Sequence, residues 1–319
     1  MGVGCSANGW SAVGSALANS TLAGVLAGFM INGIVLVLGN KPTEMKAEYV
    51  RGLSLLFAAF IALGFDAFLF GLVTGDSTSD SVSACRRAWT EAMLGAGLLA
   101  VGTVAIIAGF VYLFSAYFGS PQAEWKDSVD MLKTLCNVVR VGVAVAIVAC
   151  LYMTTRSYLY AIYGGSIPQA EGYLLYEYVA YGLGIVWFVF YALRSHSFDN
   201  RVSQLVRANT NQGLFTALKI GIYASVIYTL LSAVAATMVA TSSSSFWYPI
   251  DWRVRFIIIV TATWVSLISL IPLVFLLGSA VPPFGQPLLP NRPGEGAPAD
   301  ASSSQDPSPP EMASPPPPS

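Results

Sequence analysis

The stretch GLSLLFAAFIALGFDAFLFGLV, residues 52–73, carries no charged side chain other than Asp66. A transmembrane helix needs about 20 predominantly apolar residues, because the hydrocarbon core is roughly 30 Å thick and a helix rises about 1.5 Å per residue. No water satisfies backbone groups in that layer, so the segment must pair its own amides and carbonyls as a helix. Residues 52–73 therefore predict a membrane-spanning helix that contains a single acid.

Apolar runs of this kind recur along the chain, and seven of them cover residues 20–39, 52–73, 92–118, 135–154, 173–193, 214–240 and 255–280. The chain is 55% hydrophobic and only 10% charged, whereas soluble domains carry about 25% charged residues. The runs are continuous and too long for the alternating segments of about ten residues in a β-barrel. The sequence therefore predicts an all-α integral membrane protein with a seven-helix transmembrane bundle.

The distribution of Lys and Arg predicts how the bundle is oriented. With the N-terminus outside, eleven of the 16 basic residues fall on the inner side and five on the outer side, as the positive-inside rule expects. We therefore predict an outside N-terminus and an inside C-terminus. The predicted domains are an extracytoplasmic arm at 1–19, the transmembrane domain at 20–280 and a disordered, Pro-rich cytoplasmic tail at 281–319.

The residue bias of the chain indicates its origin. Ala, Gly, Val and Pro are abundant, and Arg outnumbers Lys by 11 to 5. Such a bias is typical of bacteria with GC-rich DNA, so we predict a multi-pass protein of a bacterial cell (inner) membrane. The lipid bilayer is then its first partner.

Asp66 finds no partner on its own helix, since its neighbours three and four residues away are Ala62, Leu63, Leu69 and Phe70. A partner must come from another helix. The ends predicted to lie outside supply charged candidates, and with Asp66 these form the predicted ligand or ion site: Arg86, Arg87, Glu91, Glu177 and Arg253.

Three interpretations of Asp66 remain open. It is a structural acid that ties helices together through an ion pair or hydrogen bond, or it belongs to an ion, proton or polar-ligand site, or it is poorly paired and merely tolerated. An ionisable group at the bilayer centre costs roughly 2.5–3.5 kcal/mol on insertion scales. Asp66 is therefore expected to face the bundle, to pair with another group or to stay protonated.

Two of the four cysteines are candidates for a disulfide. Cys5 and Cys85 both lie on the predicted outer side, where disulfides form and persist; two free thiols are the alternative. Cys136 and Cys150 stand 14 residues apart on one predicted helix, or about 21 Å along its axis. They cannot pair with each other, because bridged Cα atoms lie within about 7 Å.

Glycines on two predicted helices favour close packing. Gly24 and Gly28 form a G-x-x-x-G motif on the first helix, and Gly95, Gly102 and Gly109 form a stripe at intervals of seven on the third. Small residues let transmembrane helices approach closely. We therefore expect a tightly packed bundle, with contacts inside the molecule favoured over dimer contacts.

The sequence lacks the usual catalytic constellations. Its only histidine, His196, lies in a predicted inner loop, and no G-x-x-x-x-G-K-[ST] motif occurs. Metal hydrolases need clustered His, Asp or Glu ligands, and a Ser–His dyad needs a histidine within a span. We therefore predict a non-enzymatic protein with no metal and no cofactor.

The first functional hypothesis is a protein that binds or translocates a small polar or ionic ligand through an outward-facing site around Asp66. The alternative is a sensor or scaffold whose inner loops and tail recruit cytoplasmic proteins, since PLLP at 287–290 has the P-x-x-P spacing that aromatic grooves bind. A third hypothesis is an enzyme that acts on lipid through carboxylates alone. We expect no nucleic-acid partner, and the oligomeric state stays open.

Overall fold

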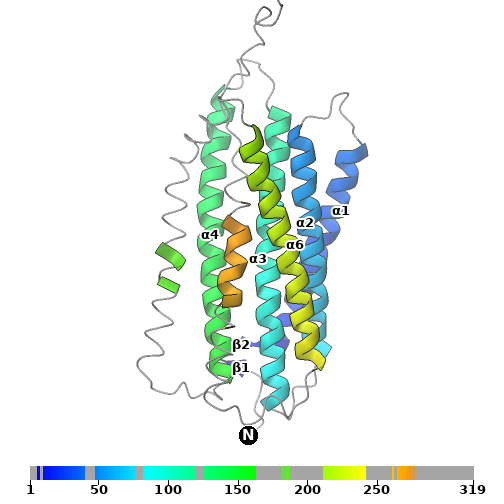
Figure 1. Cartoon of the computed structure of the whole chain (residues 1–319), viewed down its shortest axis with the longest axis vertical. Helices are drawn as coiled ribbons and strands as arrows, with labels where there is room; N and C mark the ends of the chain where they lie inside the picture. Colours follow the sequence, from blue (N-terminus) through cyan, green and yellow to red (C-terminus); the bar gives the residue numbers. More distant parts are fainter. Residues whose placement is uncertain are drawn as a thin grey trace, which may run out of the picture. The chain divides into compact units, whose positions relative to one another are not determined.

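Five long helices dominate the part of the chain that the computed structural model describes (Figure 1). The described residues are 6–7, 10–39, 47–75, 82–118, 126–162, 181–182, 184–186, 211–241, 261, 264–274 and 276. The long helices are α1 (Ala12–Gly39), α2 (Ala47–Gly75), α3 (Val82–Phe118), α4 (Lys126–Ile162) and α6 (Asn211–Thr241). The other elements are β1 (Ser6–Ala7), β2 (Trp10–Ser11) and a short apolar helix, Trp264–Val274.

All five long helices are long and apolar enough to cross a membrane, so the prediction of an all-α membrane protein is confirmed. The seven-helix count is not. The predicted fifth span is described only at 181–182 and 184–186, and the seventh is helical at Trp264–Val274. The direction in which the helices cross the membrane stays a prediction, and the tail at 281–319 lies outside the described residues.

A short hairpin leads directly into α1. Its strands β1 and β2 are antiparallel, with Ser6 opposite Ser11, and the intervening sequence, residues 8–9, is Asn-Gly, which favours tight hairpin turns. The Gly14 amide donates a hydrogen bond to the Ser11 hydroxyl at 3.1 Å, which is the geometry of a helix N-cap. This cap explains why α1 begins at Ala12, earlier than the apolar run alone indicated.

The hairpin marks one end of the bundle. β1 contacts α4 and β2 contacts α1, and the Thr90 hydroxyl near the start of α3 donates to the Tyr158 hydroxyl near the end of α4 at 3.4 Å. We call this the hairpin end: α1 and α3 begin there, and α2, α4 and α6 end there (Figure 1).

The interface between α2 and α3 is closed by the predicted glycine stripe. A Cβ atom placed on Gly102 would lie 2.7 Å from the Leu63 side chain, and one on Gly109 would lie 2.8 Å from Leu56. Real Cβ contacts are not that short, so only glycine allows α2 to approach here. The prediction of close packing along α3 is confirmed.

The G-x-x-x-G motif of α1 behaves differently. A Cβ atom on Gly24 or Gly28 would meet no atom within 4 Å in the described part of the chain, and both residues are exposed. The expected contact inside the molecule is therefore not made by any residue that the structure describes. The residues of α1 that face the bundle are alanines such as Ala16, Ala23 and Ala27, which are buried instead.

Candidate functional site

Asp66 is fully buried in α2, at 0% exposure. Its Oδ1 atom lies 3.1 Å from the position that a Cβ on Gly95 of α3 would occupy, and the ring of Phe70 is equally close to that position. Neither carboxylate oxygen of Asp66 has a hydrogen-bond partner among the residues that the structure describes. The acid is thus enclosed by apolar groups.

The pattern of α2 explains why the acid faces inward. Ala62, Leu69 and Phe70 share its side of the helix, and all three are buried, whereas Phe65 and Phe68 on the other side are exposed. This side of α2 packs against α3 and α6, and Asp66 is therefore buried together with its neighbours. Phe65 and Phe68 are left on the exposed side.

Tyr228 of α6 is the polar side chain that approaches Asp66 from a third helix. It is nearly fully buried, and its hydroxyl packs directly on Gly97 of α3. It lies near enough to Asp66 for the two acidic groups to repel each other when both are ionised. The same hydroxyl lies near Ser232 and Ser269 and interacts with them. It makes no hydrogen bond of good distance and angle to any described residue. We call Asp66, Gly95 and Tyr228 the Asp66 junction.

Hydroxyl groups continue from this junction across the bundle. Ser269 donates to the carbonyl of Ser266 at 2.5 Å, and the Ser266 and Thr155 hydroxyls share a hydrogen bond of 3.0 Å. These side chains are buried, and with Tyr228 they form what we call the hydroxyl cluster: Thr155, Tyr228, Ser232, Ser266 and Ser269. Sequence reasoning missed it, although the spacing of Ser266 and Ser269 places them on one face of a helix.

Only part of the charged site predicted from the sequence is brought together. Glu91 is buried in α3 one helical turn from Gly95, so it lies on the face that Asp66 contacts. Arg86 is nine residues before Gly95, or about 13 Å along the helix, and is half-buried near the hairpin end, as is Arg87. Both arginines and Glu91 have partners of their own.

The other two predicted site residues, Glu177 and Arg253, lie outside the described residues. Among the residues that are described, His, Cys, Asp and Glu do not gather in groups of three or more. This part of the chain therefore offers no set of side chains that could hold a metal ion.

Cys85, at the start of α3, is disulfide-bonded, whereas Cys150 is free. Cys5 lies outside the described residues but directly precedes β1, and its bond to Cys85 stays a prediction.

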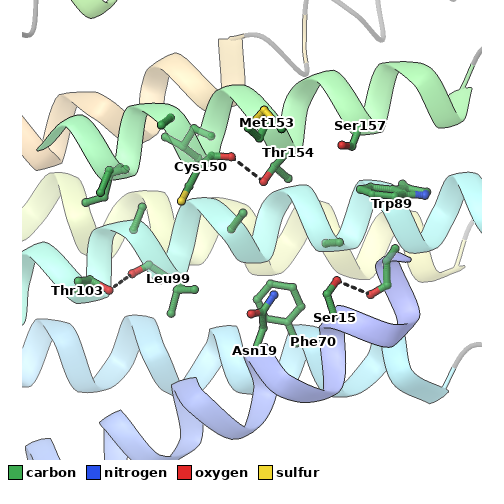
Figure 2. Close-up of a pocket in the computed structure, with 18 residues that line it drawn as sticks. Ser15, Asn19, Phe70, Trp89, Leu99, Thr103, Cys150, Met153, Thr154 and Ser157 are labelled. Carbon is green, nitrogen blue, oxygen red and sulfur yellow. Dashed lines mark hydrogen bonds between the residues drawn. The ribbon is translucent and has the colours of Figure 1, made fainter. Parts of the chain in front are cut away.

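A cavity of about 510 Å³ lies on another side of α3, between α1, α2, α3 and α4 (Figure 2). Its walls are mainly aliphatic, and the polar residues that line it are Ser15, Asn19, Trp89, Thr103, Cys150, Thr154 and Ser157. Phe70 lines it as well, so one aromatic ring contacts both the cavity and the Asp66 junction. We call this space the α1–α4 cavity; sequence reasoning did not find it.

Comparison of the chain with protein-family models, curated proteins and solved structures finds no match. The fold and the buried site together define a helical, multi-pass membrane protein.

Proposed function

We propose that this multi-pass membrane protein binds and releases a proton at Asp66 and passes it along the hydroxyl cluster. The observation that carries the proposal is the complete burial of Asp66 without a hydrogen bond to either oxygen among the described residues. A buried carboxylate without a partner is expensive in an apolar medium. A bound proton removes that charge, and this favours a proton-binding role over an ion pair.

The surroundings of Asp66 favour a proton over a metal cation as the ligand. Metal cations such as Ca²⁺ take six to eight oxygen ligands and Mg²⁺ demands an octahedral shell. Asp66 and the Phe70 ring instead fill the space beside Gly95, and the neighbours Ala62 and Leu69 are apolar. A proton needs only one oxygen and no cavity, so it suits a tightly packed junction.

The hydroxyl cluster supplies the route in this proposal. Tyr228 lies near enough to Asp66 for the two groups to repel each other when both are ionised, and its hydroxyl also lies near Ser269. Ser266 joins this segment to Thr155 of α4. Hydroxyls both donate and accept hydrogen bonds, so each can pass on one proton as it takes up another. Ser269 donates to the Ser266 carbonyl, so the transfer requires its hydroxyl to rotate from that carbonyl to the Ser266 hydroxyl. Thr155 lies seven residues before the end of α4 and Asp66 nine residues before the end of α2, so the route runs across the bundle at about the depth of Asp66.

Release of the proton is expected to move helices. An ionised Asp66 would be left against apolar side chains and the backbone of α3, at roughly 2.5–3.5 kcal/mol on insertion scales. That penalty falls when water enters or when α2 separates from α3. Proton binding would therefore be coupled to the closure of the α2–α3 interface.

Proton flux into vesicles tests the proposal. The full chain is reconstituted with an enclosed pH-sensitive dye, and a potassium diffusion potential drives protons inward. We expect Asp66→Asn to reduce the flux at least tenfold and Tyr228→Phe to reduce it severalfold. Thr21→Val is the matched control, because the Thr21 hydroxyl is exposed on α1 and donates to the Leu17 carbonyl.

One result would decide against this function. Equal flux in Asp66→Asn and wild type, with both proteins folded, would remove Asp66 from the route. The sensor or scaffold hypothesis would then be favoured if deletion of residues 282–319 abolished capture of a cytoplasmic partner. Glu91→Gln serves as a second acid variant. Glu91 is buried on the face of α3 that Asp66 contacts, so this variant tests whether the loss of any buried carboxyl nearby reduces the proton flux.

A further inference from the structure

The α1–α4 cavity is a separate feature from the Asp66 junction. Its volume of about 510 Å³ falls within the range of roughly 300–1,000 Å³ that small-molecule sites occupy. Asp66 does not line it; Phe70 closes it on the side of the junction. Because four different helices contribute to its walls, the cavity belongs to the folded bundle and not to one helix surface (Figure 2).

The walls of the cavity are apolar along most of its length. Ala96, Leu99 and Ala100 of α3 face Ala146 and Ile147 of α4 across it. The two threonines that line it use their hydroxyls within their own helices. Thr103 donates to the Leu99 carbonyl at 2.7 Å and Thr154 donates to the Cys150 carbonyl at 2.8 Å (Figure 2). This part of the cavity therefore suits hydrocarbon.

Polar groups gather toward the hairpin end of the cavity. Trp89 is only 5% exposed. Its indole nitrogen is buried and has no acceptor among the described residues. Ser157 lies at the same end, as does Ser15 of α1 (Figure 2). A buried N–H without an acceptor is unfavourable, so a ligand with an oxygen at this end would satisfy it.

We propose that the α1–α4 cavity binds a fatty-acyl ester, with the hydrocarbon chain between α3 and α4 and the ester carbonyl accepting a hydrogen bond from Trp89. The distance along α3 from Trp89 to Thr103 is 14 residues, or about 21 Å, which suits an elongated chain. No Lys or Arg is among the described residues that line the cavity, so the uncharged ester fits better than a free carboxylate. This proposal does not depend on proton binding at Asp66.

Cys150 provides a direct reporter, because it is free and lines the cavity. The full chain in detergent is treated with N-ethylmaleimide, with and without methyl stearate, and alkylation of the Cys150 peptide is followed by mass spectrometry. We expect the ester to slow alkylation at least tenfold. Ala96→Phe, which fills the cavity, should abolish this protection, while Ala18→Phe on the exposed side of α1 should retain it.

Further variants and probes keep the test decisive. Ala146→Phe fills the cavity from α4 and replaces Ala96→Phe if that protein does not fold. Trp89→Phe should need severalfold more ester for the same protection, because the chain still fits but its carbonyl loses the donor. Protection by a phosphatidylcholine in place of methyl stearate would identify a bilayer lipid as the source. The absence of protection by either ester, or equal protection in both filled variants, would overturn the proposal.

Discussion

The two sides of α3 differ in how they meet their neighbours. Toward α2, Gly102 and Gly109 leave no room for even a methyl group. Toward α1 and α4, Ala92 and Ala96 line a cavity of about 510 Å³. Both sides consist of small residues, so residue size alone does not close an interface. The neighbouring helix closes it when its leucines reach the small residues, as Leu63 of α2 reaches Gly102.

The two sides of α3 therefore suit different ligands. The closed side holds Asp66 beside Gly95 and Phe70, whereas the open side has volume but few polar groups. We therefore assign the proton to the closed side and the fatty-acyl chain to the open side.

The largest expected effect comes from a large residue on the closed side. Gly102→Leu would drive a side chain into Leu63, since even a Cβ would lie 2.7 Å from it, and overpacking of this kind costs about 3 kcal/mol. Ala96→Leu, on the open side, extends into the cavity and should change stability by less than about 0.5 kcal/mol. Thermal unfolding in detergent measures both, and equal losses would show that the two sides do not differ.

A smaller effect is expected where α6 meets α3. The Tyr228 hydroxyl packs directly on Gly97, so Gly97→Ala should destabilise the protein and Tyr228→Phe should relieve much of that loss. Residues in direct contact show interaction energies of about 0.5–3 kcal/mol in double-mutant cycles; we expect about 1 kcal/mol here. Additive effects of the two substitutions would mean that the hydroxyl does not contact Gly97.

The smallest effect is expected on α1. Because a Cβ on Gly24 or Gly28 would meet no atom of the described residues within 4 Å, Gly24→Leu and Gly28→Leu should alter the free energy of unfolding of the monomer by less than about 0.5 kcal/mol. The measurement is urea or thermal unfolding at low protein concentration. A loss similar to that of Gly102→Leu would place another helix of the same chain against this motif.

The sequence predicted those features that depend on periodicity within one helix. Apolar runs identified the membrane helices, the interval of seven identified the α3 stripe, and the neighbours of Asp66 showed that its own helix offers no partner. Hydroxyl groups were harder to interpret, because a serine or threonine in a span usually donates to its own helix, as Ser225 donates to the Gly221 carbonyl.

Contacts between helices could not be read from one sequence. Gly24 and Gly28 have the spacing of a packing motif, but which side of α1 meets α2 depends on the whole bundle. For example, the Ser20 hydroxyl donates to the Ala67 carbonyl of α2 at 2.9 Å. The side of α1 that carries Ser20 therefore faces α2, and the spacing of the glycines did not predict this. The α1–α4 cavity likewise depends on four helices at once.

The central claim is that Asp66 holds a proton inside the closed bundle, and infrared spectroscopy tests it most directly. The difference spectrum between wild type and Asp66→Asn in lipid at neutral pH isolates the carboxyl group at this position, and Glu91→Gln serves as the reference for another buried acid. We predict the carbonyl stretch of a protonated carboxylic acid that shifts on exchange into D₂O. The paired symmetric and antisymmetric bands of a carboxylate in its place would contradict the claim and would favour an ion-paired, structural Asp66.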